Sequence, residues 1–202
     1  KFALDILGEI RDSRSVEPVA ARLAAADPNV RAAAAEALGK IGGAEAITAL
    51  QQTLDAPDHL LKLAALDALA RLKTAPALER LGTLSQDRFL KRPVYRLLGR
   101  SADPRAFPLL AQGLLEPSRG TRDAALAAIG EQRRLRRGDD VEALARAVRE
   151  AAKYTGVGNA CEAALRSSDV AVSEGALAVL GWIGDLNRAS AIAHAAEDER
   201  LR

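Results

Sequence analysis

Arginine is the residue type in this chain whose spacing most directly indicates chemistry. Between residues 88 and 100 an arginine stands at every fourth position, which predicts a cationic stripe along one helix whose start Pro93 delays. A second group is expected in the following loop. Guanidinium groups bind carboxylates and phosphates through paired hydrogen bonds, so both groups predict an anionic partner. The stripe is Arg88, Arg92, Arg96 and Arg100, and the second group is Arg133, Arg134, Arg136 and Arg137.

The near-neutral net charge of +2 hides an uneven distribution along the chain. Residues 1–87 carry 10 Lys and Arg against 12 Asp and Glu, residues 88–137 carry 12 against 4, and residues 138–202 carry 7 against 11. A basic middle segment therefore lies between acidic flanks. Two interpretations stay open: a surface that binds anions, and a solvated surface that the acidic repeats partly neutralise.

Trp182 is the only tryptophan. It occupies a position that is charged in each of the other repeats described below. An exposed tryptophan is a frequent anchor at protein interfaces. The alternatives are that a further C-terminal repeat covers it, or that an extra helix near Asn159–Arg166 does.

Residues for catalysis, metal binding or cofactor binding are sparse. The two histidines, His59 and His194, lie far apart in the sequence, which speaks against a histidine metal site. Cys161 stands among alanines and is expected to be a small buried residue. The Gly156-Val-Gly158 stretch lacks the third glycine of a dinucleotide-binding motif. We expect no catalytic residues, no metal, no cofactor, and hence no enzyme.

A short block of small and aliphatic residues recurs along the chain. Its marker position advances by 31, 31, 29, 31 and 51 residues, and the last step is a repeat carrying an insertion. A period of this size predicts an all-α solenoid of stacked helical hairpins. The marker is Gly8, Gly39, Ala70, Gly99, Gly130 and Gly181.

One repeat shows how the hairpin is encoded. Val16, Val19 and Leu23 share one face of a first helix. Asp27 can cap the second helix, which should run over 28–41 and end at Gly42. The same scheme predicts repeats at 1–10 (second helix only), 15–41, 46–72, 76–101, 104–132, 139–184 with the insertion, and 187–202 in part.

The turn Asp27-Pro-Asn-Val-Arg31 and the ending Ala37-Leu-Gly-Lys-Ile-Gly42 resemble HEAT repeats of the short bacterial kind, which are frequent in phycobilin lyase subunits. The resemblance implies a right-handed α-solenoid of about five to six repeats whose second helices line a concave face. HEAT-like arrays serve as adaptors, lyase chaperones, DNA glycosylases and regulatory arms, so the resemblance does not select one function. The paired His-Glu motifs of HEAT-like hydroxylases are missing.

The insertion in the fifth repeat should disturb the regular stacking. It predicts a helix at 139–153, a break, and an extra helical piece at 159–166. We interpret residues 1–202 as one domain, a piece of a longer chain whose exposed end repeats favour self-association.

Equivalent positions in successive repeats stack into columns. One column is cationic in four of five repeats, and the HEAT resemblance implies that its members pair with turn aspartates such as Asp27, Asp58 and Asp87. On the outward face, Glu36 with Lys40 and Asp67 with Arg71 are favourable i,i+4 pairs, whereas Arg96 and Arg100 repel at that spacing. The cationic column reads Arg31, Lys62, Lys91, Arg122 and Ser173.

These observations predict a non-catalytic scaffold or regulatory module, in the cytoplasm, that binds an acidic protein segment through its concave face. The first alternative is nucleic-acid binding by the basic segment, which the acidic flanks oppose. The second is a lyase or chaperone subunit that handles a tetrapyrrole or a modified protein. That function needs an apolar pocket, for which the insertion at 155–166 beside Trp182 is the candidate place.

Overall fold

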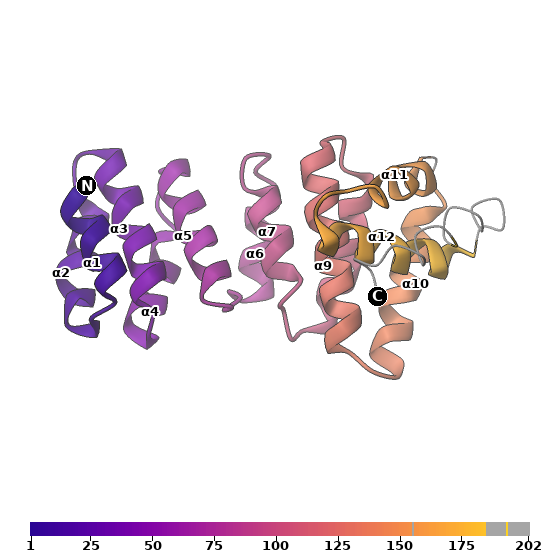
Figure 1. Cartoon of the computed structure of the whole chain (residues 1–202), viewed down its shortest axis with the longest axis horizontal. Coiled ribbons are helices and arrows are strands. Elements are labelled where there is room, and N and C mark those ends of the chain that lie inside the picture. The colour runs from indigo at the N-terminus through magenta and orange to yellow at the C-terminus, as the bar shows by residue number, and fades with distance from the viewer. Residues whose placement is uncertain (155, 185–192, 194–202) are drawn as a thin grey trace. The chain divides into compact units, whose positions relative to one another are not determined.

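The computed structural model describes residues 1–154, 156–184 and 193. Regular structure in these residues is entirely helical (Figure 1). Short 3-10 turns at Ser13–Ser15, Ala21–Ala24, Pro104–Ala106 and Gly113–Leu115 flank α2 and α8. The helices are α1 (Phe2–Ile10), α2 (Val16–Ala20), α3 (Pro28–Ile41), α4 (Ala44–Thr53), α5 (His59–Arg71), α6 (Leu78–Leu84), α7 (Lys91–Leu98), α8 (Phe107–Gln112), α9 (Arg119–Leu135), α10 (Asp139–Ala152), α11 (Val157–Ala164) and α12 (Val170–Ile183).

The chain divides into two compact units, residues 1–97 and 98–202, and each is described by itself. Both are stacks of helical hairpins, which is the predicted α-solenoid class of fold. The organisation of the whole chain as one domain stays a prediction.

In the first unit the second helices α1, α3 and α5 lie side by side (Figure 1). The marker glycines permit this close packing. A Cβ atom added at Gly8 would lie 3.2 Å from the Cα atom of Ala37, and one added at Gly39 would lie 2.7 Å from the Cβ atom of Ala68. Small residues at the contact therefore set the distance between neighbouring repeats.

The ends of α3 follow the sequence prediction. The helix runs over Pro28–Ile41, and the Asp27 side chain accepts a hydrogen bond of 2.8 Å from the backbone amide of Asn29. Gly42 and Gly43 follow with φ angles of 77° and 88°, values that only glycine adopts without strain. The glycine pair thus separates the second helix of one repeat from the first helix of the next.

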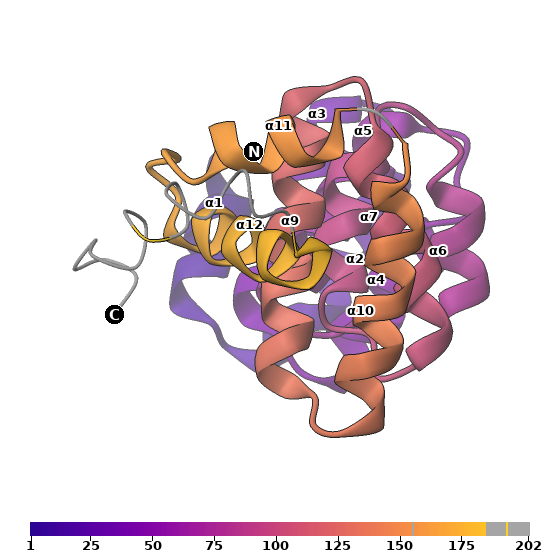
Figure 2. The ribbon, with the colours of Figure 1, turned by 90° about the vertical axis from the view of Figure 1, so that its right-hand side faces the viewer.

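In the second unit α12 crosses α9 steeply instead of lying alongside it (Figure 2). Gly130 meets the backbone of Gly175, with a distance of 3.1 Å from an added Cβ atom to the Gly175 nitrogen. Regular stacking would place Val179 there, because Val179 holds the position of Ala37. The contact has slid by about one helical turn, and the predicted irregularity at the insertion is confirmed.

The insertion itself consists of the predicted helices with shifted ends. The helix expected at 139–153 is α10, and the extra piece expected at 159–166 is α11, which begins two residues earlier. The predicted partial repeat 187–202 lies almost wholly outside the described residues. None of the described helices is both long enough and apolar enough to span a membrane.

Two predictions about the arginines are wrong in detail. Arg88 lies in the turn before α7 and Arg100 just after it, so the stripe of four does not run along one helix. The Asp87 side chain accepts a hydrogen bond of 2.9 Å from the amide of Phe89 within that turn. Arg133 and Arg134 lie in the last turn of α9 and not in a loop, because neither glycine nor proline interrupts the helix before Gly138.

Candidate functional site

The cationic column at the start of the second helices has a structural role. The Arg31 guanidinium donates hydrogen bonds of 2.8 and 2.9 Å to the carbonyl oxygens of Ala25 and Ala26, and it forms an ion pair with Asp58 of the next repeat. Arg122 makes the same kind of carbonyl contacts, to Glu116 and Pro117. The predicted ladder is confirmed at the Arg31–Asp58 pair.

The last column member, Ser173, and the turn aspartate Asp87 differ from the predicted pairing of cations with turn aspartates. Ser173, which replaces the cation in the last repeat, donates its hydroxyl to carbonyl oxygens at the end of α11 and just after it. Asp87 pairs with His59, whose Nδ1 atom lies 2.7 Å from a carboxylate oxygen. The carbonyl oxygens at the end of the preceding helix thus receive hydrogen bonds from Arg31, Arg122 and Ser173 in their respective repeats.

A second ladder lies on the outward face of the second helices. The Nζ atom of Lys40 lies 2.9 Å from a carboxylate oxygen of Glu9 on α1 and 3.4 Å from one of Glu36 on its own helix. The hydrogen bond from Lys40 lowers the pKa of Glu9, and the same bond raises the pKa of Lys40. This lysine links two neighbouring repeats.

The arginines Arg96 and Arg100, whose spacing predicts repulsion, belong to the same kind of ladder. Arg96 lies 3.6 Å from Asp67 on α5, within the first unit. Arg100 lies 3.5 Å from Glu131 on α9, within the second unit. Each side chain is thus directed toward an acid on a neighbouring second helix, which offsets the repulsion that spacing alone predicts.

Arg136 and Arg137 also make internal contacts. Arg136 donates to the carbonyl oxygen of Ser101 at 2.8 Å and to the Oε1 atom of Gln132 at 3.0 Å, and its guanidinium lies 5.7 Å from the centre of the Phe107 ring. Arg137 donates to the carbonyl oxygens of Arg134 and Arg136 at the end of α9. Both side chains therefore stabilise the end of this helix.

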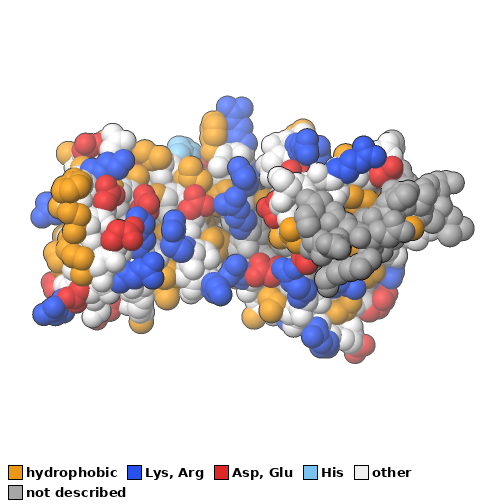
Figure 3. Space-filling view, in the orientation of Figure 1, with side chains coloured by type: hydrophobic (Ala, Val, Ile, Leu, Met, Phe, Trp, Pro, Cys, Tyr) orange, Lys and Arg blue, Asp and Glu red, His pale blue; other side chains and the backbone are white. Residues whose placement is uncertain are grey.

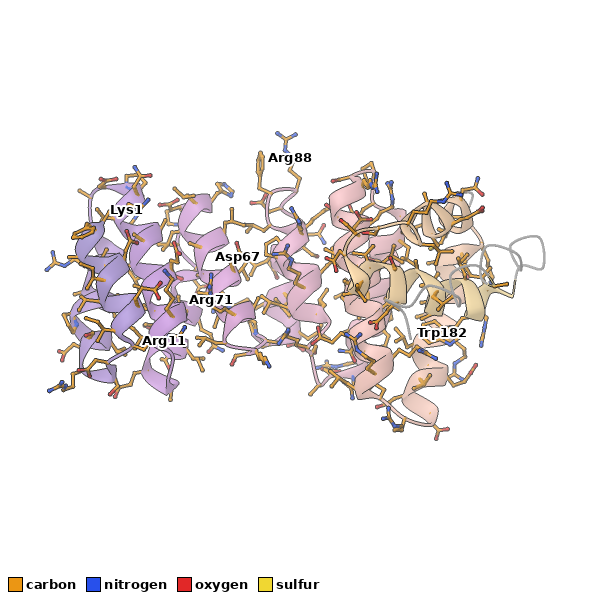
Figure 4. The ribbon with its side chains drawn as sticks, in the orientation of Figure 1. Lys1, Arg11, Asp67, Arg71, Arg88 and Trp182 are labelled. Atoms are coloured by element: carbon orange, nitrogen blue, oxygen red, sulfur yellow. The ribbon has the colours of Figure 1, made fainter. Side chains whose placement is uncertain are left out.

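Arg92 and Arg133 are different from these. Both side chains are exposed, and neither has an ion-pair or hydrogen-bond partner within the described part of the chain. Figure 3 shows Lys and Arg side chains gathered over α7, which carries Arg92. Arg88 projects from the turn before α7 and stacks on the Phe89 ring, 4.5 Å from its centre (Figure 4). Of the eight predicted arginines, Arg92 and Arg133 are thus the freest to bind a partner.

Three predicted residues meet in one pocket, which we call the α9/α12 pocket. It has a volume of about 330 Å³, and Arg133, Arg134 and Trp182 line it together. Arg134 forms an ion pair with Glu174 across it. Trp182 is half-buried near the end of α12 (Figure 4), where Arg149 donates a hydrogen bond of 3.2 Å to its carbonyl oxygen. The remaining lining residues are Gly130, Leu177, Ala178 and Gly181.

The prediction of an apolar pocket in the insertion beside Trp182 has to be corrected. The cavity that α11 lines has a volume of about 90 Å³ and includes the buried Cys161, but Trp182 is not among its lining residues. Pockets for organic ligands usually measure about 300–1,000 Å³. This cavity is therefore too small for a tetrapyrrole.

Two features of the structure were not predicted from the sequence. A groove of about 320 Å³ lies between α3 and α5, with Glu36, Asp67 and Arg71 on its lining (Figure 4). Gln132 is fully buried, and its Nε2 atom lies 3.1, 3.0 and 2.8 Å from the carbonyl oxygens of Leu98, Gly99 and Ser101. A glutamine two residues after the marker glycine was the available signal for the second feature.

The described residues contain no group of three or more His, Cys, Asp or Glu side chains arranged to hold a metal ion. The geometry instead leaves Arg92 exposed on α7 in the first unit and places Arg133 beside Trp182 in the second unit, and in each unit it uses many of the other charges to join neighbouring repeats. That division between structural and free charges is what an interaction surface requires.

Comparison with known families agrees with this architecture. Residues 1–70 match the family model for HEAT repeats. These residues, which comprise α1 to α5, are therefore similar to HEAT repeats. A search of curated proteins by sequence gave no match.

Solved structures resemble the chain over most of its length. The complex of CpcE and CpcF of phycocyanin lyase from Nostoc sp. PCC7120 shares 25% identity, with a TM-score of 0.61 over 95% of this chain and 74% of that one. Two engineered proteins from the Northeast Structural Genomics Consortium share 21% and 20% identity, with TM-scores of 0.59 and 0.57. They cover 93% and 92% of this chain, and 87% and 88% of their own chains are matched. The likeness to the engineered proteins concerns the fold alone.

Proposed function

We propose that this protein is a non-catalytic scaffold that binds an acidic segment of another protein through the outward face of its second helices. The observation that carries the proposal is which arginines have a bonding partner inside the protein and which do not. Arg92 and Arg133 are exposed and unpaired in the described structure, whereas neighbouring cations are held by acids or carbonyls. Arginine without an internal partner can form paired hydrogen bonds with carboxylates of a ligand.

The rigid architecture supports this role. A preformed helical surface loses little conformational entropy on binding, and complementary charge raises the encounter rate. HEAT repeats suit protein interactions for this reason, and the residues that match the HEAT model form α1 to α5 of the first unit.

The choice of test variants follows from the contacts. Reversing Arg96 or Arg100 would break ion pairs inside the protein and confuse loss of binding with loss of stability. The double variant Arg92→Glu with Arg133→Glu changes unpaired side chains only. A matched control reverses Arg22 and Arg146, which are exposed on a 3-10 turn and on α10 and produce the same change in net charge.

The experiment is a fluorescence-polarisation titration with a labelled glutamate-rich peptide. We expect the Arg92→Glu/Arg133→Glu variant to bind at least about tenfold more weakly, from loss of two charged contacts, and the control to bind like the wild type. Equal affinity of the double variant and the wild type would refute the proposal.

The basic segment 88–137 favours nucleic-acid binding as a second candidate. A labelled random-sequence DNA duplex in the same titration distinguishes the two, because duplex binding through phosphates weakens steeply with salt. Tight duplex binding near physiological salt, without peptide binding, would favour the nucleic-acid function. The likeness to CpcE and CpcF of phycocyanin lyase favours a lyase-type subunit as a third candidate.

A further inference from the structure

The α9/α12 pocket has an apolar part that charge recognition alone does not use. Leu177, Ala178 and Trp182 contribute to its lining, together with two glycines that add no side chain. Its volume of about 330 Å³ lies at the lower limit for ligand pockets of about 300–1,000 Å³. The space suits a single large side chain better than a cofactor.

Gly181 keeps this pocket open, although the fold does not require a glycine there. A Cβ atom added at Gly181 would meet no atom of the described residues within 4 Å, and the residue lies inside α12 without a positive φ angle. At the equivalent Gly39 the same addition would collide with the next helix. The packing reason for a glycine is therefore absent at Gly181, and what the missing side chain leaves is space beside Trp182.

The charged rim complements the apolar part. Arg134 is neutralised by Glu174, so Arg133 remains as the pocket's unpaired charge among the described residues. A ligand that buries an apolar side chain against Trp182 can place a neighbouring carboxylate on Arg133. Aromatic anchors held in a pocket with adjacent charged contacts are the usual centres of binding energy at protein interfaces.

We infer that the α9/α12 pocket holds one large apolar side chain of the partner, and that a carboxylate beside it binds Arg133. The inference rests on the proposed function and adds the partner's chemistry: an acidic segment that carries an aromatic or large aliphatic residue. Burial of such a side chain predicts a preference of about tenfold to a hundredfold over alanine at the same place.

The test compares two short glutamate-rich peptides that differ only at one central residue, phenylalanine or alanine. Because Trp182 is the only tryptophan, its fluorescence reports the pocket directly. We expect the phenylalanine peptide to bind at least about tenfold more tightly and to shift the tryptophan emission, whereas the alanine peptide leaves the emission nearly unchanged.

Two variants of one residue complete the experiment. Gly181→Leu fills the pocket from its own lining, so it should abolish the preference for the phenylalanine peptide over the alanine peptide. Gly181→Ala adds only a methyl group and should retain the preference. Circular dichroism of both variants is the check that each one folds.

The outcomes separate this inference from the proposed function. Equal binding of the two peptides to the wild type, or a preference that survives Gly181→Leu, overturns the pocket assignment and leaves the scaffold function standing. If neither peptide binds, both the pocket assignment and the scaffold function are overturned.

Discussion

The contact between α3 and α5 allows a prediction whose magnitude follows from the structure. In the variant Gly39→Ala, the added methyl carbon would lie 2.7 Å from the Cβ atom and 2.9 Å from the Cα atom of Ala68. Carbon atoms pack best at about 3.5–4.0 Å, so the two helices must separate by about 1 Å. The obstacle is a methyl group and the backbone, neither of which can rotate away.

Three terms set the size of the effect. Overpacking of this kind costs about 1–3 kcal/mol, and a radial gap of about 0.5–1 Å removes a quarter to a half of each dispersion contact along the interface. Replacing glycine by alanine inside a helix returns about 1 kcal/mol. We expect a net loss of about 1–2 kcal/mol in the free energy of unfolding, and about 2–4 °C in melting temperature for each kcal/mol.

The assay is urea unfolding followed by far-UV circular dichroism. Gly82→Ala is the matched control, because Gly82 lies inside α6 and a Cβ atom there would meet nothing within 4 Å in the part of the chain that the structure describes. The control should be stabilised by up to about 1 kcal/mol. If Gly39→Ala unfolds at the same urea concentration as Gly82→Ala, the account of close packing at the marker glycines is wrong.

Three further changes test the charges and the buried amide. The hydrogen bond from Arg31 lowers the pKa of Asp58. In unfolding titrations, the stability lost in Asp58→Asn should therefore be largest above the ordinary carboxyl pKa of about 3.9 and should vanish as the pH falls through the lowered pKa. A loss of stability that does not depend on pH would contradict this. Gln132→Leu should cost at least about 2 kcal/mol in urea unfolding, against about 0.5 for the exposed Gln112→Leu; equal costs would contradict it. Arg136→Ala should lower the melting temperature in calorimetry and leave peptide affinity unchanged, and the reverse pattern would assign Arg136 to binding.

The helices were largely predictable from the sequence. Capping aspartates, glycine stops and apolar spacing are local signals, and they place α3 at its observed ends. The same local rules failed at Arg133 and Arg134, because helix ends without a glycine or proline are set by packing. The steep crossing of α12 over α9 depends on Gly175, whose added Cβ atom would overlap the carbonyl group of Leu126. A contact between residues so far apart in sequence has no local signal.

The candidate site was predictable in its composition but not in its contacts. Counting charges identifies the basic segment, yet it cannot tell a free arginine from one that bonds a neighbouring repeat. Arg92 and Arg136 look alike in the sequence, and only the fold separates them, because Ser101 and Gln132 surround the second. The grouping of Trp182 with Arg133 in one pocket is likewise a tertiary arrangement of α9 and α12, for which the sequence holds no local signal.

The ion pairs between neighbouring second helices make the order of the repeats matter. Glu9 faces Lys40, and Glu131 faces Arg100, so the sign of the charge at one column position depends on which neighbour it meets. Transplanting the repeat 104–132 directly behind α1 would set Glu131 against Glu9. Although the backbones of the repeats are alike, recombination or duplication that shuffles them would bring like charges together, and such rearranged arrays should be less stable than the natural order.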